Sequence, residues 1–219
     1  MPAHDSIRDV RGIGDVHILS SDLTAEAIEQ ITTAGRVAWD IETNGLDPLT
    51  AQIGTCQLSI EAGRTFVITG LAQSRPERLA RLLANPDVLK VFHHAPFDLA
   101  FMSHAWEVKP VNSACTKVAS KLLHPQARNS EHSLKHLMWQ NFEISLDKEI
   151  RFTDWLSDSL SARQVEYAVG DVVKLLNLYD LLKHRLRAEG LLDLYERCCA
   201  FLPSHTELRL HGMPDPFRY

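Results

Sequence analysis

Cysteine is scarce in this chain, and long apolar runs are absent. Only 4 of the 219 residues are cysteines, two of them are adjacent at Cys198 and Cys199, and no pair has the CxxC spacing. A disulfide framework or a cysteine-ligated zinc site is therefore not indicated, and a reducing compartment is favoured over secretion. No run reaches the roughly 18 apolar residues that span a bilayer, and the N-terminus lacks an apolar segment of signal length. These absences predict a soluble, cytoplasmic protein with no membrane partner.

An excess of positive charge is absent as well. The chain has 23 basic and 28 acidic residues and a net charge of −5, which argues against a protein held on nucleic acid by its overall charge. One tract, residues 113–151, reverses this balance. Its basic residues are Lys117, Lys121, Arg128, Lys135, Lys148 and Arg151. The charge pattern thus excludes a generic nucleic-acid coat protein but allows a local nucleic-acid site.

The length and the apolar content of 45% allow one domain with a substantial core. We expect a polar leader over 1–15, a single domain over 16–202 and a tail over 203–219. The residue patterns predict strands at 16–19, 36–43, 52–60, 65–69 and 88–92, with an antiparallel meander among them. They predict helices at 22–34, 76–84, from 96 onward, 113–123, around 134–138, 161–190 and 191–202. Ser21 or Asp22 would cap the first of these helices, and Ser113 would cap the helix at 113–123. The helix at 161–190 is predicted to be one long helix.

The stretch VAWDIETNGLDP, residues 37–48, carries the first chemical signal. On a strand, Asp40 and Glu42 point to one face while Trp39 and Ile41 point to the other. Two carboxylates about 5 Å apart repel by roughly 3 kcal/mol at an effective dielectric near 20. The pair therefore requires protonation, a basic partner or a metal ion.

Three further side chains can join this pair. Asp98 lies at a predicted strand-to-helix corner, where polar groups often face clefts. Tyr167 and Asp171 are neighbours on one helix face, with Gly170 between them to admit another backbone or a ligand. If the four acids converge, two hard cations, Mg²⁺ or Mn²⁺, would neutralise them, and such pairs about 3.5–4 Å apart serve phosphoryl displacement. Each residue alone also has an ordinary reading, such as a solvated face or a half-buried phenol.

The motifs resemble those of the DEDD 3′-5′ exonucleases, specifically the ribonuclease D branch with a tyrosine in its third motif. DIET from Asp40, FHHAPFD ending at Asp98, and YAVGD from Tyr167 to Asp171 are similar to the family's three motifs in order and spacing. The segment SLDKEIRFTDWLSDSLSARQVEYAVGDV is also similar, and the likeness covers about residues 16–200. The resemblance implies a ribonuclease H-like α/β fold, with a mixed central β-sheet flanked by helices.

The resemblance also implies an activity. It predicts hydrolysis of the terminal phosphodiester at a free 3′ end of single-stranded nucleic acid, RNA in the first instance, releasing nucleoside 5′-monophosphates. Two Mg²⁺ or Mn²⁺ ions would be held by Asp40, Glu42, Asp98 and Asp171, and Tyr167 would orient the attacking water. A DNA exonuclease, an inactive nucleic-acid-binding scaffold and a structural metal-binding domain stay open as alternatives. The sequence gives no signal for the oligomeric state.

Residues for substrate binding are implied less directly. The resemblance places Thr43 and Leu46 against the terminal nucleotide, with a satisfied turn and core packing as the alternatives. Lys148 and Trp155, together with Arg151, would meet phosphates or a base, unless the tryptophan is buried and the cations are solvated. His94 occupies a position where the family often has asparagine, and its imidazole can still hydrogen-bond a phosphate.

Some other positions depart from the family's pattern, and others are predicted to lie in the hydrophobic core. Cys115 and Thr116 stand where an Asp-Thr pair is common, so any accessory role of that acid is lost. Met138 and Trp139 are expected in the core. No nucleic-acid-binding domain is visible after the catalytic unit, and we therefore expect distributive action on long substrates that is sensitive to salt.

Overall fold

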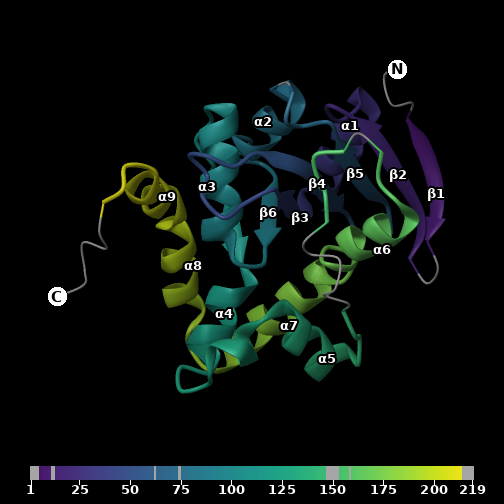
Figure 1. The fold of residues 1–219 in the computed structure, drawn as a ribbon. Helices are drawn as coiled ribbons and strands as arrows, with labels where there is room; N and C mark the ends of the chain where they lie inside the picture. Colours follow the sequence, from purple (N-terminus) through teal and green to yellow (C-terminus); the bar gives the residue numbers. More distant parts are fainter. Residues whose placement is uncertain are drawn as a thin grey trace.

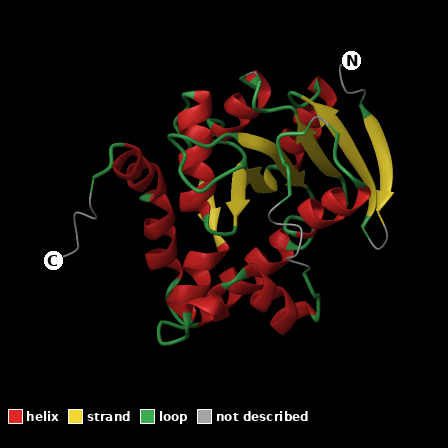
Figure 2. Ribbon diagram, in the orientation of Figure 1, coloured by secondary structure: helices red, strands yellow, loops and turns green. Residues whose placement is uncertain are grey.

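The computed structural model describes residues 5–10, 13–61, 63–73, 75–146, 153–157 and 159–213. These residues form one mixed sheet with the strand order β1-β2-β5-β4-β3-β6-β7 (Figures 1 and 2). The strands are β1 (Ser6–Val10), β2 (Gly14–Ser20), β3 (Arg36–Thr43), β4 (Ile53–Ser59), β5 (Thr65–Thr69), β6 (Leu89–Phe92) and β7 (Ser113–Cys115).

Helices pack around this sheet. They are α1 (Ala25–Ala34), α2 (Glu77–Leu83), α3 (Ala95–Trp106), α4 (Thr116–Leu123), the 3₁₀ turn η1 (Asn129–His132), α5 (Leu134–Phe142), α6 (Ala162–Gly170), α7 (Leu175–Ala188), α8 (Leu192–Ala200) and α9 (Leu202–Leu210). Within the described residues, no helix combines the length and the apolar character that a membrane crossing requires.

The sheet packs against two separate clusters of apolar side chains. Trp39 packs on Phe92 and, from α3, on Trp106, with ring centroids 6.0 and 6.2 Å apart. On the opposite face, Val67 of β5 belongs to a smaller cluster with Val165 and neighbouring residues of α6. Because both faces are covered, β4 and β5 are buried along their whole length. The acidic face of β3 therefore looks toward α6.

The predicted mixed sheet flanked by helices is confirmed, and so is the antiparallel meander of β3, β4 and β5. Strand β2 pairs in parallel with β5, which makes the sheet mixed. Strand β1 lies in the segment predicted as a leader and pairs antiparallel with β2. Helix α9 lies in the segment predicted as a tail and packs against α3. The fold therefore extends beyond residues 16–202 at both ends.

The prediction of one long helix over 161–190 is wrong. Its start is confirmed, since Ser161 and Gln164 cap each other's backbone N–H groups. Helix α6 ends at Gly170, however, and α7 begins only at Leu175. The residues at this break read VGDVV, and valine, glycine and aspartate all have low helix propensity. The break leaves Asp171 at the end of α6. The predicted helix at 191–202 is confirmed as α8, and the further helix α9 follows it from Leu202.

Two predicted helix caps are also wrong. Ser113 belongs to β7, and α4 begins after it at Thr116. Helix α1 is capped by Thr24, not by Ser21 or Asp22. The Asp22 carboxylate instead accepts hydrogen bonds from two backbone N–H groups at the start of α2, at 2.8 and 3.0 Å. Asp22 thus satisfies the first turn of a helix distant in sequence, whose own N-cap residue is a proline.

Candidate active site

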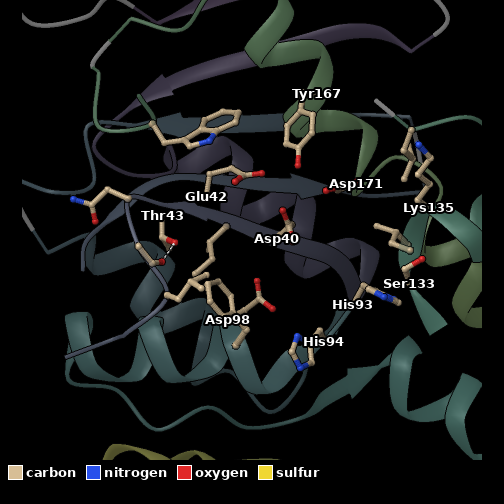
Figure 3. A pocket seen from close by; sticks show the side chains of 18 of the residues that line it. Asp40, Glu42, Thr43, His93, His94, Asp98, Ser133, Lys135, Tyr167 and Asp171 are labelled. Atoms are coloured by element: carbon tan, nitrogen blue, oxygen red, sulfur yellow. Dashed lines mark hydrogen bonds between the residues drawn. The ribbon is translucent and has the colours of Figure 1, made fainter. Parts of the chain in front are cut away.

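Four acids from three separate parts of the chain converge beside β3. One carboxylate oxygen each of Asp40, Glu42 and Asp171 lie within 4.8 Å of one another. Asp98, from the first turn of α3, is only 3% exposed and points toward Asp40 (Figure 3). The predicted convergence of these side chains is therefore present in the structure.

Local geometry explains how each segment delivers its acid. The alternation of β3 puts Asp40 and Glu42 on one face, and the register with β4 shifts just after Glu42. At the corner between β6 and α3, His94 adopts a left-handed backbone with φ 69°. This conformation is strained for a residue other than glycine, and such strain is frequent at functional sites. It turns the chain sharply enough to place Asp98 beside the strand.

Burial and the neighbouring carboxylates disfavour the charged forms of Asp40 and Asp98. Removal from water, and then the charges of Asp98, Asp171 and Glu42, raise the pKa of Asp40 well above its usual value. Burial raises the pKa of Asp98 in the same direction, partly offset by backbone hydrogen bonds and by Arg209. A set of oxygen-only donors that repel one another fits hard divalent cations such as Mg²⁺ or Mn²⁺.

These raised pKa values predict how stability depends on pH without metal. Between the ordinary value near 3.8 and the raised values, the native state binds more protons than the unfolded state. The free energy of unfolding contributed by these acids therefore falls as pH rises through that window. In EDTA, we expect the melting temperature of the wild type to fall relative to that of Asp98→Asn between about pH 5 and pH 8.

The check is a set of thermal melts of both proteins in EDTA across this pH range, repeated with Mn²⁺. Since bound cations replace the protons and stabilise the native state, Mn²⁺ should remove the wild-type deficit at the higher pH. Parallel pH curves for the two proteins in EDTA would show that Asp98 has no raised pKa.

Tyr167 lies above the acids. It projects from α6, and in Figure 3 its hydroxyl points toward Glu42 and Asp171. Its ring packs against Trp155, with centroids 5.7 Å apart. Trp155 is 1% exposed, so it is the buried tryptophan of the two alternatives. Neither face of its indole ring is open to a base. Trp155 instead supports the tyrosine that faces the acids.

Gly54 of β4 makes this support possible. A Cβ atom at Gly54 would lie 2.1 Å from the backbone oxygen of Trp155 and 2.5 Å from its carbonyl carbon. We expect Gly54→Ala to push the Trp155 segment outward, which would cost about 1–3 kcal/mol of stability as overpacking does. It should also lower activity, because Tyr167 loses its packing partner. Chemical denaturation and a hydrolysis assay measure the two effects.

Gly170→Ala is the matched control. Among the described residues, a Cβ atom at Gly170 would meet Leu146 Cδ2, at an ordinary 3.5 Å, so no described backbone approaches Gly170 closely, and the approach of a ligand there stays a prediction. If Gly54→Ala is as stable and active as Gly170→Ala, the close contact between Gly54 and Trp155 contributes neither to stability nor to activity.

A cavity of about 660 Å³ lies over the acids, and its walls carry most of the predicted substrate residues. Thr43 and Leu46 line one side. The Thr43 hydroxyl donates to the Gly45 carbonyl at 2.6 Å, which agrees with the turn alternative. Leu46 is 71% exposed, so the core-packing alternative is wrong and its side chain is available as a wedge.

The remaining predicted substrate residues have different outcomes. His94 lines the cavity, and partial removal from water, together with Lys117 and Arg209, lowers its pKa, so the ring is neutral near pH 7. Lys148 and Arg151 lie outside the described residues.

The prediction for α5 is half right. Met138 is in the core as predicted, whereas Trp139 is 59% exposed, so its placement in the core was wrong.

The structure adds residues that sequence reasoning missed. Ser133 and Lys135 line the cavity on the side opposite Thr43, as Figure 3 shows, and Lys117 lines it too. The basic tract contained a signal for the two lysines. Arg209 of α9 donates to the Pro96 carbonyl at 2.8 Å and lies over the Phe97 ring. No local pattern marks it, because its contacts depend on how α9 packs.

Comparison with known proteins agrees with this geometry. Residues 16–187 match the 3′-5′ exonuclease domain family. The chain belongs to this 3′-5′ exonuclease family. The solved structure of Brucella melitensis NrnC with bound Mg²⁺ is similar to it, with a TM-score of 0.84 and 33% identity, over 93% of this chain and 98% of that chain. The two proteins thus share their fold along almost the whole length of both chains.

Ribonuclease D proteins are also similar to this chain. The protein from Gluconacetobacter diazotrophicus is 33% identical over 138 residues, which cover 63% of this chain and 33% of that protein. The Haemophilus influenzae protein is 30% identical over 150 residues, covering 68% and 37%. The chain spans about a third of the length of these curated relatives. Escherichia coli RNase D has a TM-score of 0.75 at 23% identity, over 87% of this chain and 50% of that one, which supports the ribonuclease H-like fold.

Proposed function

We propose that this exonuclease hydrolyses the terminal phosphodiester at the free 3′ end of single-stranded RNA and releases nucleoside 5′-monophosphates. The observation that carries the proposal is the convergence of four carboxylates in one open cavity beneath a tyrosine hydroxyl. Similarity to ribonuclease D proteins supports RNA as the substrate.

Each residue has a defined task in this reaction. Asp40, Glu42, Asp98 and Asp171 hold two Mg²⁺ or Mn²⁺ ions, directly or through water. When bound, these ions activate water and neutralise the charge on the attacking and leaving oxygens. The Tyr167 hydroxyl aligns the attacking water with the phosphorus, and Trp155 keeps its ring in place.

The cavity walls position the substrate. Leu46, being exposed at the rim, packs against the terminal base, and Thr43 lies beneath the terminal sugar. His94 is neutral near pH 7 and donates one ring N–H to a phosphate oxygen without adding charge. The terminal nucleotide therefore sits on the Thr43 side, and the scissile phosphate lies over the acids.

One observation favours short oligonucleotides within this substrate class. The similar Brucella melitensis NrnC has been solved bound to pGG, at 33% identity over 98% of its chain. By analogy, a dinucleotide would place its single phosphodiester over the acids. The DNA and inactive-scaffold alternatives are decided by the same assay.

The test is digestion of 5′-labelled RNA of two, five and twenty nucleotides, with matched DNA, in Mg²⁺, Mn²⁺ or EDTA. We expect stepwise shortening from the 3′ end, inhibition by a 3′-phosphate and no activity in EDTA. Asp98→Asn purified in parallel controls for a contaminating nuclease. Early internal cuts in a circular RNA, or full activity in EDTA, would contradict the proposal.

A further inference from the structure

Helix α5 presents an exposed tryptophan next to the catalytic cavity. Leu134, Leu137 and Met138 form its buried side, while Trp139 is 59% exposed. A single exposed apolar side chain is common on protein surfaces and has no meaning alone. Its position relative to the cavity is the informative feature.

Lys135 lies between Trp139 and the acids. It lies four residues earlier on α5, so the two side chains are neighbours on one helix face. Lys135 is also exposed and lines the cavity that contains the acids, whereas Trp139 is not among the described residues that line it. We call this pair the α5 strip. It begins at the cavity wall and continues outward along the helix.

The path proposed for the substrate strand also runs toward α5. If the terminal nucleotide lies beside Thr43, the rest of the strand leaves the acids on the opposite side, where Figure 3 shows Ser133 and Lys135. Lys117 lines the cavity as well. Lys135 places a positive charge at this exit in a chain whose net charge is negative. Single strands are held by cations along the backbone together with aromatic rings that stack on bases.

We propose that the α5 strip is a binding subsite for the part of the strand that lies 5′ to the cleaved bond, with Lys135 contacting a phosphate and Trp139 stacking on a base. The inference rests on the proposed function and deepens it. Because Trp139 lies beyond the cavity wall, it contacts strands longer than two nucleotides and leaves a dinucleotide untouched.

The experiment compares Trp139→Ala with the wild type on an RNA dinucleotide and on an RNA of five nucleotides. We expect KM for the longer RNA to rise on the order of 10-fold, which is within the range that one stacked base contributes. Both kcat and KM for the dinucleotide should stay unchanged. Trp139→Phe should restore most of the loss, and Lys135→Ala should reduce the salt dependence of KM for the longer RNA by about one phosphate contact.

Leu194→Ala, which removes an exposed apolar side chain from α8, is the control and should change neither substrate. Unchanged kinetics of Trp139→Ala on the longer RNA overturn the inference and leave the proposed function intact. A change in oligomeric state by light scattering, without a change in KM, overturns it too and assigns the strip to a contact between protein chains. A wild type that cuts neither RNA overturns the proposed function itself.

Discussion

Asp98→Asn is expected to reduce hydrolysis by on the order of 10³-fold or more, because binding of the ions at the reacting phosphate is worth several kcal/mol. The same loss is expected for Asp40→Asn and Asp171→Asn, whose carboxylates belong to the same cluster. Without metal, Asp98→Asn should melt at a higher temperature than the wild type near pH 8, since it removes a buried charge that repels Asp171 and Asp40.

Initial rates on the five-nucleotide RNA at saturating Mn²⁺ and thermal melts in EDTA measure both effects. Asp193→Asn is the matched control, because Asp193 lies on α8 and pairs with Arg197 on the surface. Loss of activity in Asp98→Asn together with a lower melting temperature in EDTA would point to a structural role of the acid. Retained activity in any two of the three variants would remove the cluster from catalysis.

Tyr167→Phe is expected to lower kcat by on the order of 10²–10⁴-fold, the usual range for a positioned acid-base group. The substitution removes only the hydroxyl that points toward Glu42 and Asp171, and it keeps the ring on Trp155. Stability and KM should therefore barely change. A core-packing role predicts the reverse, with near wild-type turnover and a lower melting temperature.

Single-turnover hydrolysis at saturating Mn²⁺, alongside thermal melts, separates these two roles. Tyr179→Phe is the control, since Tyr179 is a buried tyrosine of α7 whose hydroxyl lies near Lys183, and it does not line the cavity. A Tyr167→Phe protein that cuts at the wild-type rate removes the hydroxyl from the mechanism and leaves the four acids in place.

The parts of the site that follow from local geometry could be predicted from the sequence. Alternation along β3 fixes the common face of Asp40 and Glu42, and a proline after the strand marks the corner that presents Asp98. The break after α6 was missed because the apolar periodicity of α7 continues that of α6, although VGDVV between them disfavours a helix. Strand β1 was missed because SIRDV is a short, polar edge strand paired on one side only.

Other features depend on contacts between distant segments and have no local signal. The sequence around Gly54 does not show that Trp155 packs against this glycine. The hydrogen bond from Arg209 to the Pro96 carbonyl likewise depends on how α9 packs on α3. Trp139 is a different case, since its exposure could have been inferred. It is adjacent to Met138, which lies on the buried stripe, and one residue advances about 100° around a helix, so Trp139 points away from that stripe.

The most direct test of the catalytic assignment is anomalous diffraction from crystals of the wild type grown with Mn²⁺ and a short RNA whose last linkage is a slowly hydrolysed phosphorothioate. We expect two manganese peaks among the carboxylates of Asp40, Glu42, Asp98 and Asp171, next to the last phosphorothioate and facing the Tyr167 hydroxyl. RNA bound with its 3′ end in the cavity, but with no manganese peak at these four acids, would contradict the account.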